Sequence, residues 1–125
     1  MSLLVDGMNV IGSRPDGWWR DRPKARRDLV CDLASMVEAG EKVTVVFDGK
    51  PTLEEEERSR DSGVFVVFAP GGPNAADHMI VDLLGDEERP SEVTVVTSDA
   101  ALAGSVRALG AKVEAAGSFR SRLAR

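Results

Sequence analysis

Residues 42–49 read KVTVVFDG, a run of β-branched and aromatic residues that ends in an acid and a glycine. A nearly continuous apolar run of this length predicts a strand buried on both faces, as in parallel sheets. Further short β-type runs lie on either side of it, at residues 3–5, 64–69, 92–97 and 111–115. The chain therefore contains five candidate strands, of which the run at 111–115 is the weakest.

Stretches with apolar residues at helical spacing separate the candidate strands. The expected helices cover residues 23–39, 75–84, 99–109 and, more briefly, 118–123. Pro23 suits the first turn of the first helix, and Gly40, Gly85 and Gly110 follow the first three helices, where glycine commonly ends a helix. The charged connection around residues 54–57 has no such pattern, so we expect a solvated helical turn or a mobile loop there.

Strands that alternate with helices predict βαβ units with right-handed crossovers around a parallel sheet. The length of 125 residues fits one domain and leaves too little chain for two independent cores. We therefore expect a single α/β domain over residues 1–125, a three-layer sandwich with a mostly parallel five-stranded sheet.

Composition excludes several classes of protein. Cys31 is the single cysteine, so no internal disulfide can form, which fits a reducing compartment. No apolar run approaches the roughly 18 residues that a membrane span needs. We expect a cytoplasmic protein with no membrane partner, in which Cys31 adjoins the apolar stripe of its helix and is buried and unreactive.

The net charge of -5 conceals a segregation along the chain. Residues 14–27 hold six basic and two acidic side chains, and residues 100–125 hold five basic and one acidic. The segment between them, residues 28–99, holds five basic and seventeen acidic side chains. Basic segments that flank an acidic one are typical either of a phosphate-contacting face or of an ordinary solvated surface.

Carboxylates fall where the candidate strands end. Asp6 and Asp48 directly follow such runs, Asp99 comes one residue later, and Asp77 belongs to the first turn of the helix after the third strand. Each has an ordinary explanation, as a turn residue or as a helix cap. Together, however, they are expected at the edge of the sheet where open α/β folds bind ligands.

Carboxylates that converge on one edge raise one another's pKa, and a cation relieves their repulsion. Oxygen ligands in a partly open site suit Mg²⁺ or Mn²⁺, and such an ion can activate water and orient a phosphate. The sequence has no Walker lysine motif and no G-x-G-x-x-G. With His78 as the single histidine, zinc hydrolase and cysteine nucleophile schemes lack parts, and His78 itself is expected on a different face of its helix from Asp77.

Four ordered motifs resemble a known family. They are LLVDGMNVI at residues 3–11, VVFDG at 45–49, AADHMI at 75–80 and VTVVTSD at 93–99. Together they resemble the NYN domains of PIN-like ribonucleases, and the YacP-like branch in particular. The resemblance covers nearly the whole chain, and it implies strand order 3-2-1-4-5 and endoribonuclease activity that depends on Mg²⁺ or Mn²⁺.

The resemblance also implies roles for individual residues. Asp6 is then the central metal ligand, Asn9 orients the ligand or phosphate, and Ser98 supplies a supporting or ligating hydroxyl. The implied catalytic residues are Asp6, Asn9, Asp77 and Asp99, and the implied metal ligands are Asp6, Asp77, Asp99 and, with a less defined role, Asp48.

Two positions depart from the family's pattern. Met8 stands where the family usually has an aromatic residue, which weakens an expected stacking contact with substrate. Val81 stands where an acid is frequent, and Asp82 follows it. Asp82 is five residues from Asp77, about 140° around a helix, so it does not replace the missing acid.

A basic and aromatic segment leaves the same sheet edge as Asn9. Its candidate RNA-binding residues are Arg14, Trp18, Trp19, Arg20, Arg22 and Lys24. Stacking surfaces beside phosphate contacts are typical of single-stranded RNA sites, although one tryptophan could instead close the core beneath a loop. Arg120, Arg122 and Arg125 form a second candidate patch or a solvated tail.

These observations favour an endoribonuclease that hydrolyses RNA phosphodiester bonds with Mg²⁺ or Mn²⁺, acting on messenger, transfer or ribosome-associated RNA. A first alternative is an RNA- or ribosome-binding module that keeps the fold with a degraded acidic site. A second is a metal-dependent phosphatase, which is less favoured because the first strand carries no D-x-D pair.

Overall fold

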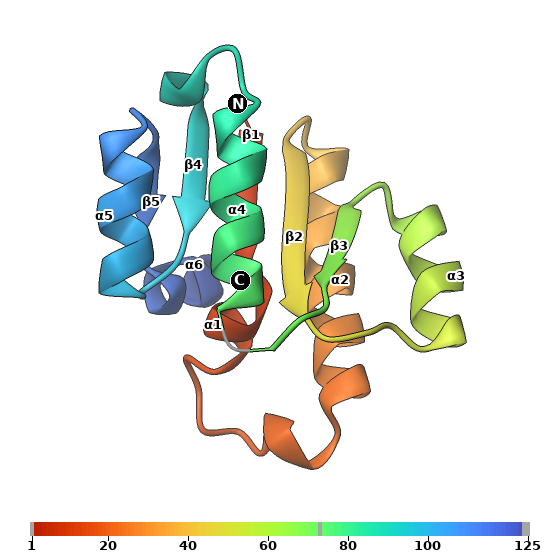
Figure 1. Ribbon diagram of the computed structural model, residues 1–125. Coiled ribbons are helices and arrows are strands. Elements are labelled where there is room, and N and C mark those ends of the chain that lie inside the picture. Colours follow the sequence, from red (N-terminus) through yellow and green to blue (C-terminus); the bar gives the residue numbers. More distant parts are fainter. Residues whose placement is uncertain (1, 73, 124–125) are drawn as a thin grey trace.

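In the computed structural model, five parallel strands form one sheet in the order β3-β2-β1-β4-β5 (Figure 1). The structure describes residues 2–72 and 74–123. The strands are β1 Ser2–Asp6, β2 Lys42–Asp48, β3 Phe65–Ala69, β4 Val93–Val96 and β5 Lys112–Glu114. Each predicted strand is confirmed to within one residue at both ends, and so are the sheet order and the α/β class.

Helices cover both faces of the sheet. They are α1 Gly7–Ile11, α2 Arg22–Glu38, α3 Leu53–Ser62, α4 Ala75–Gly85, α5 Ala100–Ala108 and α6 Ala116–Leu123, with 3-10 turns η1 Trp18–Arg20 and η2 Pro90–Glu92. Helices α4 and α5 lie in front of the sheet in Figure 1, and α2 lies behind it. No helix in the described part of the chain is both long enough and apolar enough to span a membrane.

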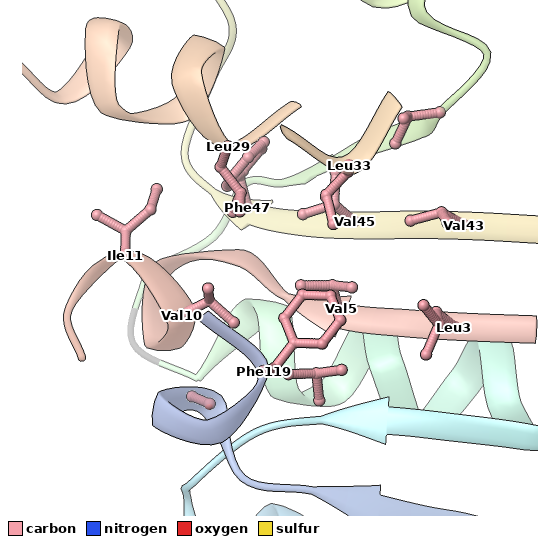
Figure 2. Packing of buried hydrophobic residues seen from close by; sticks show 13 residues of the cluster. Leu3, Val5, Val10, Ile11, Leu29, Leu33, Val43, Val45, Phe47 and Phe119 are labelled. Atoms are coloured by element: carbon pink, nitrogen blue, oxygen red, sulfur yellow. The ribbon is translucent and has the colours of Figure 1, made fainter. Parts of the chain in front are cut away.

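Alternation along the strands divides the core into two layers. Val45 and Phe47 of β2 face α2 and α6, whereas Val46 between them faces α4 and α5. Figure 2 shows Leu29 and Leu33 of α2 pointing toward β2 in the first layer. Both faces of the central strands are therefore buried, which is why they read as continuous apolar runs rather than as alternating ones.

Helix α1 was not expected from the sequence, because Asp6-Gly7 reads as a turn signal. Gly7 instead begins a helix directly after β1 and is itself buried. A Cβ atom built on Gly7 would lie 2.4 Å from both Cδ1 and Cε1 of Phe47. The helix can approach the sheet this closely only because residue 7 has no side chain.

We expect Gly7→Ala to lower the free energy of unfolding by about 2 kcal/mol, because the added methyl group overpacks the core against Phe47. Urea unfolding measures the change. Gly104→Ala is the matched control, because Gly104 lies inside α5 with open space around its Cβ position, so alanine should stabilise the protein by roughly 0.5–1 kcal/mol. Equal effects of the two substitutions would contradict the packing argument.

Residues 54–57, expected as a solvated helical turn or a mobile loop, belong to a longer helix, α3. Thr52 and Glu55 form a capping box, and the side chain of Glu55 also receives two hydrogen bonds of 2.7 Å from the Arg26 guanidinium on α2. Both partners are largely buried, with side-chain exposures of 11% for Arg26 and 5% for Glu55. One of the four consecutive acids is therefore part of the packing between two helices.

The prediction that Cys31 is buried is wrong. The apolar stripe of α2 is centred on Leu29 and Leu33, which are both buried, whereas Cys31 is exposed. A position two residues from each of them lies about 200° around a helix, on the opposite side from the stripe.

Candidate active site

Asp6 stands at the centre of the carboxyl ends of the strands. It is the last residue of β1, between β2 and β4, and it is 5% exposed. Its Oδ2 atom accepts a hydrogen bond of 2.9 Å from the hydroxyl of Thr97, which directly follows β4. A carboxyl group is thus held nearly out of water by the two neighbouring strand ends.

Burial raises the pKa of Asp6 from 3.8 to about 6. The Thr97 hydrogen bond opposes the shift, while the negative charges of Asp77, Asp48 and Asp99 add to it. Asp6 is therefore near enough to the other three predicted acids for their charges to raise its pKa.

Asp77 is half-buried in the first turn of α4. Burial raises its pKa, Asp99 and Asp48 raise it further, and the neighbouring His78 lowers it. In the part of the chain that the structure describes, no group donates a hydrogen bond to the Asp77 carboxylate. Both of its oxygens are therefore available to a ligand.

Asp48 and Asp99 each cap a helix. Asp48 Oδ1 accepts a 3.1 Å hydrogen bond from the backbone N–H of Ala76 at the start of α4. Asp99 Oδ1 accepts one of 2.9 Å from Leu102 and is the N-cap of α5. Both acids therefore have a structural role as well as a place in the cluster. The helix-cap explanation holds for Asp99, whereas Asp48, expected as a turn residue, accepts from a helix 28 residues further along the chain.

A hydrogen-bond network fixes the segment between β4 and α5. Asn9 Oδ1 accepts a 2.7 Å hydrogen bond from the Ser98 N–H, and Ser98 Oγ accepts one of 2.9 Å from the Ala116 N–H. Thr97 Oγ1 donates to Asp6 and accepts from the Asp99 N–H at 3.1 Å. Asn9 and Ser98 therefore connect three separate segments around Asp6.

Sequence reasoning missed Thr97. A threonine at the end of a strand is an ordinary β residue, and only its place directly before the candidate residues Ser98 and Asp99 could have singled it out. In the structure it is 1% exposed and contacts the side chain of one acid and the backbone of the other.

We expect Thr97→Val to move the pKa of Asp6 further upward, because the hydroxyl that favours the ionised carboxylate is lost while the shape is kept. Titration of the Asp6 side-chain ¹³C carboxyl resonance by NMR measures the shift. Thr94→Val on the same strand is the control, and it should leave the Asp6 titration unchanged. A downward movement in Thr97→Val would contradict the assigned role.

The predicted RNA-binding residues lie on and around η1. Trp18 is partly buried and packs against the core, which agrees with the alternative that one tryptophan closes the core beneath the loop. Trp19 is 49% exposed. Their rings meet edge to face with centroids 5.9 Å apart. The guanidinium of Arg22 lies 5.2 Å from the Trp18 centroid, and that of Arg20 lies 5.9 Å from the Trp19 centroid.

Lys24 and Arg14 complete this predicted set. Lys24 pairs with Asp28 at 2.9 Å, one turn further along α2, and Arg14 is exposed in the loop after α1. The segment therefore presents an exposed indole and several cations at the end of the molecule where α1 and α2 begin (Figure 1).

In the second candidate patch, Arg120 and Arg122 form hydrogen bonds and ion pairs with other parts of the chain. Arg120 donates to the backbone carbonyls of Val10 and Ile11 and pairs with Asp16 at 2.9 Å. Arg122 forms a two-pronged ion pair with Glu114. Neither is part of a free solvated tail, and Arg125 lies outside the described residues.

The donor chemistry of the acidic cluster fits a hard divalent cation. Asp6 and Asp77 both have raised pKa values because of burial and negative neighbours. Within residues 2–72 and 74–123, however, no three acidic, histidine or cysteine side chains are grouped as a ready-made metal site. The set fits an ion that is held by one or two carboxylates and otherwise by water and substrate phosphate.

The two departures from the family pattern are also visible. Met8 is partly buried and packs against the core, so it offers no stacking surface. Asp82 is exposed on α4, away from the half-buried Asp77.

Comparisons with known proteins agree with this architecture. The family model described as YacP-like NYN domain matches residues 3–125. The crystal structure of Rae1 (YacP) from Bacillus subtilis is similar with a TM-score of 0.78 and 27% sequence identity, over 99% of this chain and 74% of that one. A tryptophan-to-leucine mutant of the same protein gives 0.76 and 26%, over 98% and 74%. No curated protein matches the sequence.

Proposed function

The chain belongs to the family of YacP-like NYN domains, and from this membership and its acidic edge we propose that it is an endoribonuclease dependent on Mg²⁺ or Mn²⁺. The fold is that of PIN-like nucleases. The observation that carries the proposal is the buried carboxyl of Asp6, whose pKa is raised to about 6 by burial with contributions from three neighbouring acids. A protein retains such a destabilising arrangement when it serves a site.

In this proposal Asp6 and Asp77 hold the cation, because each has a carboxyl with a raised pKa and an oxygen to which no described group donates a hydrogen bond. The bound ion would polarise the scissile phosphate and lower the pKa of a water molecule. Thr97 keeps Asp6 oriented, and Asn9 holds the backbone of Ser98 in place at the rim. Asp48 and Asp99 add negative charge while they cap α4 and α5.

The substrate would approach over the surface around η1. Trp19 offers an exposed ring for a base, and Arg14, Arg20 and Arg22 offer charges for phosphates. Unpaired bases can stack on an indole, whereas bases inside a duplex cannot. The proposal therefore specifies single-stranded RNA, or single-stranded parts of a folded RNA.

We expect cleavage of a labelled single-stranded RNA in Mn²⁺ or Mg²⁺, and none in EDTA. Asp77→Asn should reduce the rate by more than about 100-fold, because a direct ligand matters more than the partners that orient ligands. Asp82→Asn on the same helix is the matched control and should cleave like the wild type. Cleavage that persists in EDTA, or an equal loss in both variants, would contradict the proposal.

A second candidate is an RNA- or ribosome-binding module without catalysis. The observation that favours it is the use of Asp48 and Asp99 as helix caps, together with the lack of a grouped three-donor site among the described residues. This alternative expects RNA binding that is unchanged by EDTA and by Asp77→Asn, with no cleavage under any condition.

A further inference from the structure

A cavity of about 270 Å³ lies between the loop after α1, the start of α2, and α6. Trp18 lines it together with Asp28 and Asp32 of α2, and Arg14 and Lys24 bring positive charge to it. None of the four carboxylates of the acidic cluster lines this cavity. It is therefore a second site, separate from the one described above.

Most carboxylates around the cavity already have partners. Asp16 pairs with Arg120, Asp21 caps α2 by accepting from the Lys24 N–H, and Asp28 pairs with the Lys24 ammonium. Asp32 differs, because no side chain or backbone N–H among residues 2–72 and 74–123 donates a hydrogen bond to its carboxylate. Its pKa is raised, mainly by partial removal from water and then by Asp28, while the charge of Arg120 opposes the shift.

Arg120 of α6 also lines the cavity, and it contacts α1, the helix that carries Asn9. Arg120 donates to the carbonyls of Val10 and Ile11, the last two residues of α1, at 3.1 and 3.0 Å. The same guanidinium binds Asp16 in the following loop. Arg120 thereby ties the cavity to α1 and to the loop that follows it.

We propose that this cavity is a base pocket for one unpaired guanine of the RNA, with Trp18 beside the base and the free carboxylate of Asp32 on its Watson–Crick edge. A carboxylate only accepts hydrogen bonds, and guanine is the common base that presents two adjacent N–H donors, at N1 and the exocyclic amine, on that edge. Arg14 and Lys24 would neutralise flanking phosphates. The inference rests on the proposed function, since it names the base that the same RNA-binding face selects.

Fluorescence anisotropy tests the pocket with labelled pentauridylate, the same RNA with one central guanosine, and the same RNA with one central inosine, all in EDTA. We expect guanosine to increase the affinity at least about fivefold over uridine, as one bidentate base contact typically does. Inosine, which lacks the exocyclic amine, should fall between them. Asp32→Asn should reduce the guanosine preference to less than about twofold.

Glu38→Gln is the matched control, because Glu38 is an exposed acid on the same helix outside the cavity, and it should keep the full preference. Equal affinities for the uridine and guanosine RNAs, no binding of either RNA, or the same loss in both variants would each overturn the pocket. Guanosine monophosphate that binds while neither RNA does would also overturn it, in favour of a free-nucleotide site.

The results that would contradict the nuclease proposal differ from those that would contradict the guanine pocket. A guanosine preference in EDTA together with no cleavage in Mn²⁺ would support the pocket and contradict catalysis. Cleavage in Mn²⁺ with no preference for guanosine would do the reverse.

Discussion

Replacing Asp6 by asparagine is expected to reduce the rate of metal-dependent cleavage by more than about 100-fold. The same substitution is expected to make the folded protein more stable at neutral pH. The two effects have one cause. The buried carboxylate is the proposed metal ligand, and in the absence of metal its charge is opposed by burial and by three other acids. Asparagine keeps an oxygen that can accept from Thr97 but carries no charge.

The sign of the pH dependence follows from the direction of the shift. The pKa of Asp6 is about 6 in the folded protein, against an ordinary aspartate value of 3.8, so ionisation is less favourable in the folded state. Asp6 therefore contributes no loss of stability below about pH 4, a growing loss between pH 4 and 6, and a constant loss above that. At 1.36 kcal/mol per pKa unit, the gain on substitution at pH 7.5 is at most about 3 kcal/mol.

Urea unfolding of wild type and Asp6→Asn at pH 4 and pH 7.5, in EDTA, measures this difference. We expect the stability advantage of Asp6→Asn to be large at pH 7.5 and nearly absent at pH 4. Mn²⁺ should raise the stability of the wild type at pH 7.5 and should do so much less in the variant. An advantage of the same size at both pH values would show that the charge of Asp6 is not its cause.

Replacing Arg26 by alanine is expected to lower the free energy of unfolding by about 3 kcal/mol or more. The substitution leaves Glu55 buried without its partner, and the cost of an uncompensated buried charge exceeds the worth of the ion pair itself. The guanidinium also lies 5.6 Å from the centroid of the Phe68 ring, and this packing is lost with it. Urea unfolding at pH 7 measures the change.

Two variants separate the buried charge from general effects on α2. Lys24→Ala removes an exposed ion pair from the same helix and should leave the unfolding midpoint almost unchanged. Arg26→Met combined with Glu55→Gln removes both charges, keeps an acceptor for the capping box, and should recover much of the loss. A double variant as unstable as Arg26→Ala would show that lost packing, rather than the unpaired carboxylate, is responsible.

Glu55 and Asp6 respond to acid in opposite directions. The pKa of Glu55 is lowered, because the hydrogen bonds from Arg26 and Thr52 outweigh the effect of burial. Its contribution to stability is therefore present above the ordinary glutamate pKa of 4.5 and is lost as the pH falls further. Arg26→Ala should accordingly flatten the decline in stability below about pH 4.5.

The sheet could be predicted from the sequence because its central strands are buried on both faces. Runs such as Val43–Phe47 have no polar alternation, so their type and length are clear from composition alone, and the helices between them determine the parallel topology. Helix α1 could not be predicted, because the feature that permits it is the contact of Gly7 with Phe47, forty residues away. The dipeptide Asp6-Gly7 is compatible both with a turn and with the start of a helix, so these two residues alone do not distinguish the two structures.

The acids of the candidate site were predictable from their place after the strands, whereas their partners were not. Whether Asp48 is free or caps α4 depends on where the chain returns 28 residues later. Thr97 and Arg120 act through hydrogen bonds to segments 91 and 110 residues away, and nothing in their neighbouring residues indicates those contacts. The sequence therefore predicted that the acids lie at the sheet edge, and only the folded structure shows which group each of them contacts.

The contact between Arg120 and the carbonyls of Val10 and Ile11 also has a consequence for biosynthesis. During translation, Val10 and Ile11, whose carbonyls accept these hydrogen bonds, are synthesised more than a hundred residues before the donor Arg120. A nascent polypeptide that has not yet reached residue 120 therefore lacks the guanidinium that holds the end of α1 to α6.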